Sequence, residues 1–155
     1  MLLSVQQSLF DSVDLGMAKA VVNICDCFGN ASCQNNIKFR VRYPGSYAAD
    51  RLTRKGDLTK LGTVSFNIDN DVLVINTYVC YDFTDQRGIN DGTLFDPTIF
   101  FACLYQIKDV LSDHGIDHIF ISSSSFLKFA ITDADILTLL EYVSKSLPYN
   151  VVVTV

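Results

Sequence analysis

Short apolar runs alternate with segments of helical periodicity along the chain. Four of these runs predict strands, at 2–5, 18–25, 118–121 and 151–155. The run at 18–25 (AKAVVNIC) is apolar on both faces, which is typical of a central strand in a sheet covered on both sides. Two more strands, 62–68 and 71–78, are separated by the stretch Asp69-Asn70-Asp71, which predicts a tight antiparallel hairpin.

Four helices are expected between these strands, at 34–43, 47–52, 98–114 and 132–146. Ser46 is expected to cap the second helix. Asp96 and Pro97 open the third, and Gly115 ends it. Thr132 heads the stretch TDAD, which caps the fourth.

The order of these elements predicts the fold class. Strands that alternate with helices form a mostly parallel sheet with helices on both faces. We therefore expect one α/β domain over residues 1–155, a three-layer α/β/α sandwich with a mixed sheet. The polar stretch 82–96 is its longest loop, and such loops in compact domains are usually functional or mobile.

Composition narrows the classes of partner. No run of eighteen apolar residues is present, so we expect no membrane span, and the first residues lack the basic region and the A-x-A-like cleavage site of a secretory signal. The net charge of −5 argues against a general nucleic-acid surface. One basic cluster stands out, formed by Lys38, Arg40, Arg42, Arg51, Arg54 and Lys55. It is interpreted either as two solvated helix faces or as a rim that attracts a small anion such as a diphosphate.

The five cysteines fit buried thiols in a reducing compartment, so we expect a cytoplasmic protein. The two histidines, His114 and His118, lie far from Cys25 and Cys27 in the sequence, so we expect no metal site. We also expect no cofactor.

Five stretches in this order resemble a macro domain, and the resemblance covers nearly the whole chain. They are AVVNIC, FRVRYPGSYAAD, LGTVSFNIDNDVLVINTYV, FDPTIFFACLYQIKDVLSDHGIDHIFI and ITDADILTLLEYV…VVVTV. The chain is most similar to the compact branch with terminal ADP-ribose protein glycohydrolases and small phage macro proteins. The resemblance implies that ADP-ribose lies across the carboxyl ends of the strands, where open α/β sheets bind ligands.

The resemblance also places the ligand-binding residues, and several differ from the family pattern. Ser8 stands where the family has an adenine-binding Asp. The first ligand loop, 26–34, keeps only Gly29 of the usual glycines, with Asn30 beside it and Ser32 and Gln34 at later glycine positions. The second loop, normally a glycine-rich turn that wraps the diphosphate, carries four serines followed by an aromatic residue: Ser122, Ser123, Ser124, Ser125 and Phe126. The catalytic Asp and Lys of the glycohydrolase branch have no counterpart near Phe126 or near Tyr78 and Val79.

Two polar residues of the central strand are further candidates. Asn23 is interpreted either as a ligand-binding residue or as a hydrogen-bonded core amide. Asp26, at the carboxyl end of the strand, either caps the first loop or accepts a ribose hydroxyl and activates a water, which would make it the catalytic residue.

Three functions are considered. The first is binding of ADP-ribose or a related nucleotide, with hydrolytic processing of ADP-ribose derivatives. The second is a degenerate macro domain that has lost the nucleotide and serves as a protein-interaction or oligomeric module. Apolar residues near the two loops favour this role because a sandwich cannot bury all of them: Phe83, Ile89, Leu94, Phe95, Phe100, Phe101, Phe126 and Phe129. A cysteine-dependent hydrolase ranks last, because no Cys has a His at a recognisable offset.

Overall fold

The computed structural model describes residues 1–31, 33–84 and 95–155. Its sheet has the strand order β1-β6-β5-β2-β4-β3, and every neighbouring pair is parallel except the antiparallel β3–β4 hairpin. The elements, in chain order, are β1 (Leu2–Val5), α1 (Leu9–Asp14), β2 (Ala20–Asp26), α2 (Gln34–Arg42), α3 (Pro44–Arg51), η1 (Leu58–Lys60), β3 (Val64–Asp69), β4 (Val72–Cys80), α5 (Pro97–Asp113), β5 (His118–Ser122), η2 (Ser123–Phe129), α6 (Asp133–Ser144) and β6 (Asn150–Thr154).

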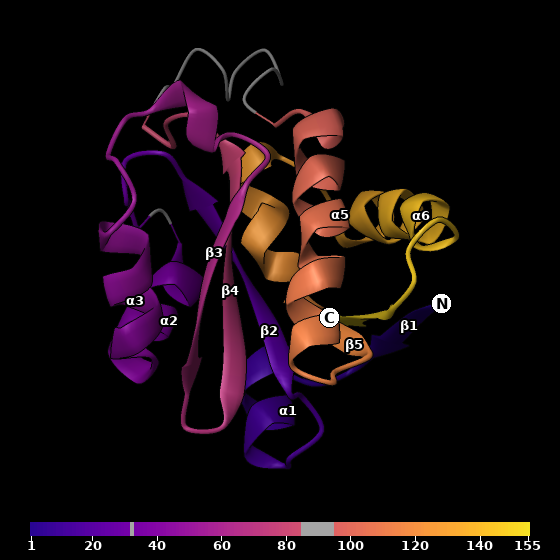
Figure 1. Ribbon diagram of the computed structural model, residues 1–155. Coiled ribbons are helices and arrows are strands. Elements are labelled where there is room, and N and C mark those ends of the chain that lie inside the picture. The colour runs from indigo at the N-terminus through magenta and orange to yellow at the C-terminus, as the bar shows by residue number, and fades with distance from the viewer. Residues whose placement is uncertain (32, 85–94) are drawn as a thin grey trace.

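Two helical layers cover the sheet, as the sequence pattern predicts (Figure 1). Alternate residues of the fully buried strand β2 face opposite layers: Val22 and Ile24 pack with α5, α6 and η2, and Val21 packs with α1 and α2. The three-layer α/β/α sandwich with a mostly parallel mixed sheet is therefore confirmed. No described helix has the length and apolar character that crossing a bilayer demands.

The hairpin and the ends of α5 and α6 form as predicted. Asn70 and Asp71 both take positive φ angles, of 50° and 64°, which is the backbone of a tight two-residue turn. Asp96 accepts a hydrogen bond of 2.9 Å from the N–H of Thr98 and so caps α5. Thr132 and Asp135 form a reciprocal capping box at the start of α6.

Two local predictions are wrong. Ser46 does not cap a helix, because α3 begins at Pro44, which takes the first helical turn. The four serines do not form a loop after the strand: Ser122 ends β5, and Ser123 begins the 3-10 helix η2. The short helix α1 was also missed, since six residues are too few to show a clear helical period.

The apolar residues near the two loops are mostly buried within the chain. Phe83, Phe95, Phe100, Phe126 and Phe129 are each at most 9% exposed and form one aromatic cluster under η2 and α5. Phe101 is partly buried against the same core. Ile89 and Leu94 lie outside the described residues. The expectation that a sandwich cannot bury these rings is wrong for the cluster, because Phe126 and Phe129 of η2 pack against the rings of the other three residues.

Candidate functional site

The two expected ligand loops meet at the carboxyl ends of β2 and β5. The side-chain amide of Asn35, in the first turn of α2, donates to Ser124 Oγ at 2.9 Å and to Ser125 Oγ at 3.0 Å. These residues are about ninety positions apart in the sequence, so only the parallel pairing of β2 and β5 brings them together. The two loops that the resemblance implies as borders of the ligand site are therefore in direct contact.

Each border offers hydrogen-bond donors. Helix α2 begins after Cys33, whose side chain makes no capping hydrogen bond, so the N–H groups of Gln34 and Asn35 in its first turn are not capped by it. Their dipoles point toward the crevice and favour negative charge. Across from them, Ser124 is exposed and shares a hydroxyl contact of 2.8 Å with Ser122. The arrangement suits an anion such as a diphosphate.

A cation that the sequence did not single out lies beneath this junction. Lys128, on η2, places Nζ 3.1 Å from Asn36 Oδ1, 3.4 Å from Ile24 O and 3.6 Å from the centre of the Phe83 ring. Burial lowers the pKa of Lys128, while nearby thiols and Asp26 act in the opposite direction. In the sequence, Lys128 is marked only by its place three residues after Ser125, and this position does not show which way the side chain points.

Asp26 holds the first loop in shape. Its Oδ1 accepts from the N–H groups of Phe28 at 3.1 Å and Asn30 at 3.0 Å, and its Oδ2 accepts from Asn30 Nδ2 at 2.8 Å and from the N–H of Phe83 at 3.0 Å. The side chain is completely buried. Both oxygens are therefore directed at protein donors, which is the geometry of a loop-anchoring carboxylate.

Asn23 belongs to a buried amide network under the same loop. Its Nδ2 donates to Asn76 Oδ1 at 3.1 Å, and its Oδ1 accepts from Asn36 Nδ2 at 2.8 Å. Asn76 in turn donates to the carbonyl of Ser46 at 3.0 Å. The network links β2, β4, α2 and α3, so it fixes the direction in which α2 leaves the first loop.

The other first-loop candidates are placed as follows. Gly29 has a φ of 72°, a left-handed conformation that glycine adopts without strain, and its carbonyl accepts from the Arg40 guanidinium. Asn30 also donates to Asp82 Oδ1 at 3.2 Å and so ties the first loop to the segment that follows β4. Ser32 lies outside the described residues. Gly29 and Asn30 thus shape the loop backbone around Asp26.

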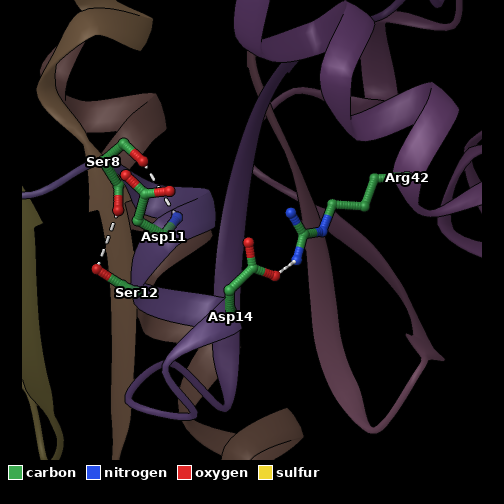
Figure 2. Close-up of polar contacts among 5 residues, drawn as sticks. All are labelled: Ser8, Asp11, Ser12, Asp14 and Arg42. Carbon is green, nitrogen blue, oxygen red and sulfur yellow. Dashed lines mark hydrogen bonds and ion pairs between the residues drawn. The ribbon is translucent and has the colours of Figure 1, made fainter.

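Ser8 and Phe126 have local roles in the structure. Ser8 is exposed and caps α1: its Oγ accepts from the N–H of Asp11 at 3.1 Å, and the last residue of α1, Asp14, pairs with Arg42 of α2 (Figure 2). Phe126 is fully buried, with its ring centre 5.4 Å from that of Phe100. The ring of Phe126 therefore faces the core rather than the crevice.

A six-stranded mixed sheet between two helical layers, with two loops meeting at the carboxyl ends of its central strands, is the architecture of a macro domain. No family model and no curated protein matches the sequence. Solved structures do match. The macrodomain of Mycobacterium tuberculosis DarG is 17% identical, with 100% of this chain and 98% of that chain covered at a TM-score of 0.74. The fold of this chain is that of a macro domain.

Two of the matching structures carry nucleotides. Thermosipho africanus DarTG in complex with ADP-ribose is 11% identical and covers 99% of this chain and 42% of that chain, with a TM-score of 0.70. The Oceanobacillus iheyensis macrodomain with ADP is 13% identical and covers 88% of this chain and 75% of that chain, with a TM-score of 0.56. At these identities the likeness is one of fold.

Proposed function

We propose that this chain binds ADP-ribose or a related nucleotide in a crevice between the 26–34 loop and the four serines at 122–125, which we call the serine turn. The observation that carries the proposal is the Asn35 bridge to Ser124 and Ser125, because it holds the first turn of α2 against a row of hydroxyls. The ADP-ribose and ADP complexes of two proteins with this fold support the same ligand class.

The diphosphate is assigned to the junction of the two loops. The N–H groups of Gln34 and Asn35 and the Ser124 hydroxyl are the donors, and the ammonium of Lys128 adds positive charge below them. These donors take the place of the backbone N–H groups that a glycine-rich loop offers to phosphate oxygens. The adenine is assigned to the side of Ser8, at the end of β1, where the hydroxyl still has its proton to donate.

The geometry supports binding more directly than hydrolysis. Asp26 was the carboxylate expected to activate a water, and its oxygens already accept four hydrogen bonds from the protein. A general base needs a lone pair directed at the proton that it removes. We therefore propose a nucleotide-binding protein and assign no catalytic step to Asp26.

Isothermal titration calorimetry tests this proposal. We expect saturable heat with ADP-ribose, weaker heat with ADP, and the weakest with ribose 5-phosphate, which lacks the diphosphate. A rise in melting temperature with ADP-ribose should accompany it. If millimolar ADP-ribose gives neither heat nor a thermal shift, the nucleotide function is wrong, and the role of a protein-interaction module takes its place.

A further inference from the structure

A second hollow lies on the α2–α3 side of the sheet. It occupies about 320 Å³ between α3, the start of the first loop and the segment 52–60. We call it the basic groove and define it by its lining residues: Phe28, Gly29, Tyr47, Asp50, Arg51, Thr53, Lys55 and Lys60. Phe28 and Gly29 belong to the 26–34 loop, so the basic groove adjoins the proposed nucleotide crevice, but neither the first turn of α2 nor the serine turn contributes to its lining.

Lys60 lies at the base of this groove. It is only 8% exposed, and its Nζ donates to the carbonyl of Cys27 at 3.2 Å and lies 4.4 Å from the centre of the Tyr78 ring. No carboxylate of the described residues lies within 4 Å of it. A buried ammonium with one hydrogen bond and no counter-ion is costly, because water no longer solvates its charge. Two of its donors are left for a ligand.

The mouth of the groove is also positive. Arg51 and Lys55 are exposed, and the Arg51 guanidinium lies 5.7 Å from the centre of the Tyr47 ring, which orients it along the wall. Asp50 is the acidic member of the lining, and its Oδ1 accepts from the Tyr78 hydroxyl at 2.7 Å. Three cations against one carboxylate leave a net positive charge in the groove.

The segment that carries these cations is held in place before any ligand arrives. The N–H of Gly56 donates to the carbonyl of Cys27 at 2.7 Å, and its own carbonyl accepts from the Tyr81 hydroxyl at 3.0 Å. Gly56 has a φ of 74°, and a Cβ there would lie 2.9 Å from the Phe28 ring, so another residue would strain the backbone and displace the ring. A preformed site binds without the cost of ordering a loop.

We propose that the basic groove binds the phosphate group of a small phosphate monoester. A phosphate dianion has enough oxygens for Lys60, Lys55 and Arg51 together, and a guanidinium pairs with two of them at once. The volume of the groove is at the lower end of the range for small-molecule pockets, so it suits a compact ligand. The aromatic side chains Phe28 and Tyr47 provide the wall against the rest of that ligand.

Thermal melting with two probes tests the proposal. Orthophosphate and ribose 5-phosphate are each added to the whole chain and compared with sodium chloride at equal ionic strength. At about ten times the dissociation constant, we expect each probe to raise the melting temperature by roughly 3 °C or more. A larger shift with ribose 5-phosphate shows that the rest of the monoester is recognised. Shifts no larger than those in chloride overturn the site.

Variants at the mouth and the base of the basic groove test where phosphate binds. Arg51→Gln with Lys55→Gln should remove most of the phosphate-induced shift while the fold is kept, because both side chains are exposed. Lys60→Met should remove it as well, and the double variant decides the matter if Lys60→Met does not fold. Lys145→Gln, an exposed lysine after α6, is the matched control and should keep the full shift. Equal shifts in the control and the double variant overturn the proposal.

The same variants separate this site from the nucleotide crevice. The Arg51→Gln, Lys55→Gln double variant should bind ADP-ribose as the unmodified chain does, because neither side chain lines the loop junction. Loss of both phosphate and ADP-ribose binding in that variant would show that the groove is part of the nucleotide site, which overturns a separate site. Failure of the ADP-ribose titration alone leaves the phosphate result, and hence this proposal, intact.

Discussion

The N–H of Phe83 donates a hydrogen bond of 3.0 Å to Oδ2 of Asp26 and thereby joins the exits of β2 and β4. The same carboxylate accepts from Phe28 and Asn30 within its own loop. One buried side chain therefore sets the start of the first ligand loop and ties it to the segment that follows β4. The shape of this loop rests on a carboxylate at its first position rather than on a run of glycines.

Replacement of Asp26 by alanine should destabilise the protein strongly. It removes four hydrogen bonds and leaves buried donors unsatisfied, which costs about 3 kcal/mol or more of the free energy of unfolding. Asp26→Asn should cost less, since its remaining oxygen still accepts from the N–H groups of Phe28 and Asn30. Equilibrium urea unfolding measures both. Asp113→Ala, at an exposed position in α5, is the control, and an equally small loss in all three variants would contradict the anchoring role.

Phe126 should matter for stability and not for ligand binding. Its ring is fully buried in the aromatic cluster, so Phe126→Ala should lower the free energy of unfolding by about 3–5 kcal/mol. Phe126→Leu keeps more of the packing and should remain folded. Calorimetry on Phe126→Leu should then give the ADP-ribose affinity of the unmodified chain. A selective loss of affinity in a folded Phe126→Leu protein would restore the contact with the ligand that the family pattern implies.

Elements whose signals are local in the sequence could be predicted from its pattern. Strand β2 was predicted because the stretch at 18–25 is apolar on both faces, and the hairpin because Asp69-Asn70-Asp71 tolerates a tight turn. Ser46 was misjudged because serine and Pro44 are both helix-start signals, and the proline took the first turn. Four serines have no periodicity, so nothing in them indicated the helix η2.

The candidate site was harder to predict than the fold. The resemblance to macro domains named the two loops, but the bridge from Asn35 to Ser124 spans 89 positions and depends on the register of the sheet. The burial of Lys128 and of Lys60 depends in the same way on tertiary packing, since lysine is seldom buried. Tertiary packing decides which polar side chains from distant parts of the chain come together. The pattern of a single sequence does not predict these contacts.

A negative charge at the loop junction should prevent nucleotide binding. Ser124→Glu places a carboxylate beside the proposed diphosphate, and like charges there should weaken ADP-ribose binding at least tenfold, about 1.4 kcal/mol. Since Ser124 is exposed, the fold should be unaffected. Ser146→Glu, the same change at an exposed position after α6, should bind as the unmodified chain does. Unchanged affinity in Ser124→Glu would move the diphosphate away from this turn.

Alkaline pH should destabilise the protein through its buried thiols. Burial raises the pKa of Cys27 to about 11 and that of Cys103 to about 12, from an ordinary value near 9. Because the folded-state pKa is the higher one, the stability that protonated thiols contribute is complete below pH 9 and is lost as the pH rises through about 11. Lys128 acts in the opposite sense, because burial lowers its pKa, but several thiols outweigh one ammonium.

Urea unfolding under reducing conditions, at pH 8 and at pH 10.5, measures this loss. The free energy of unfolding should be lower at the higher pH. Cys27→Ala removes one of the contributing thiols and should therefore lose less stability between the two values than the unmodified chain. An identical loss in both proteins would show that the Cys27 thiol does not take part.

Ser8 should allow the site to bind nucleotides whose base is not adenine. A carboxylate at this position would only accept hydrogen bonds and would favour the amino group of adenine, whereas the Ser8 hydroxyl also donates and so accommodates a carbonyl at the same place on the ring. We expect ADP-ribose and its inosine analogue to bind with dissociation constants within about tenfold of each other.

Ser8→Asp should shift the preference toward ADP-ribose without unfolding α1, since aspartate caps a helix as well as serine does. Calorimetric titration of both ligands into both proteins gives the two ratios. If the ratio is the same in both proteins, the side chain at position 8 does not contact the base, and the adenine end of the crevice lies elsewhere.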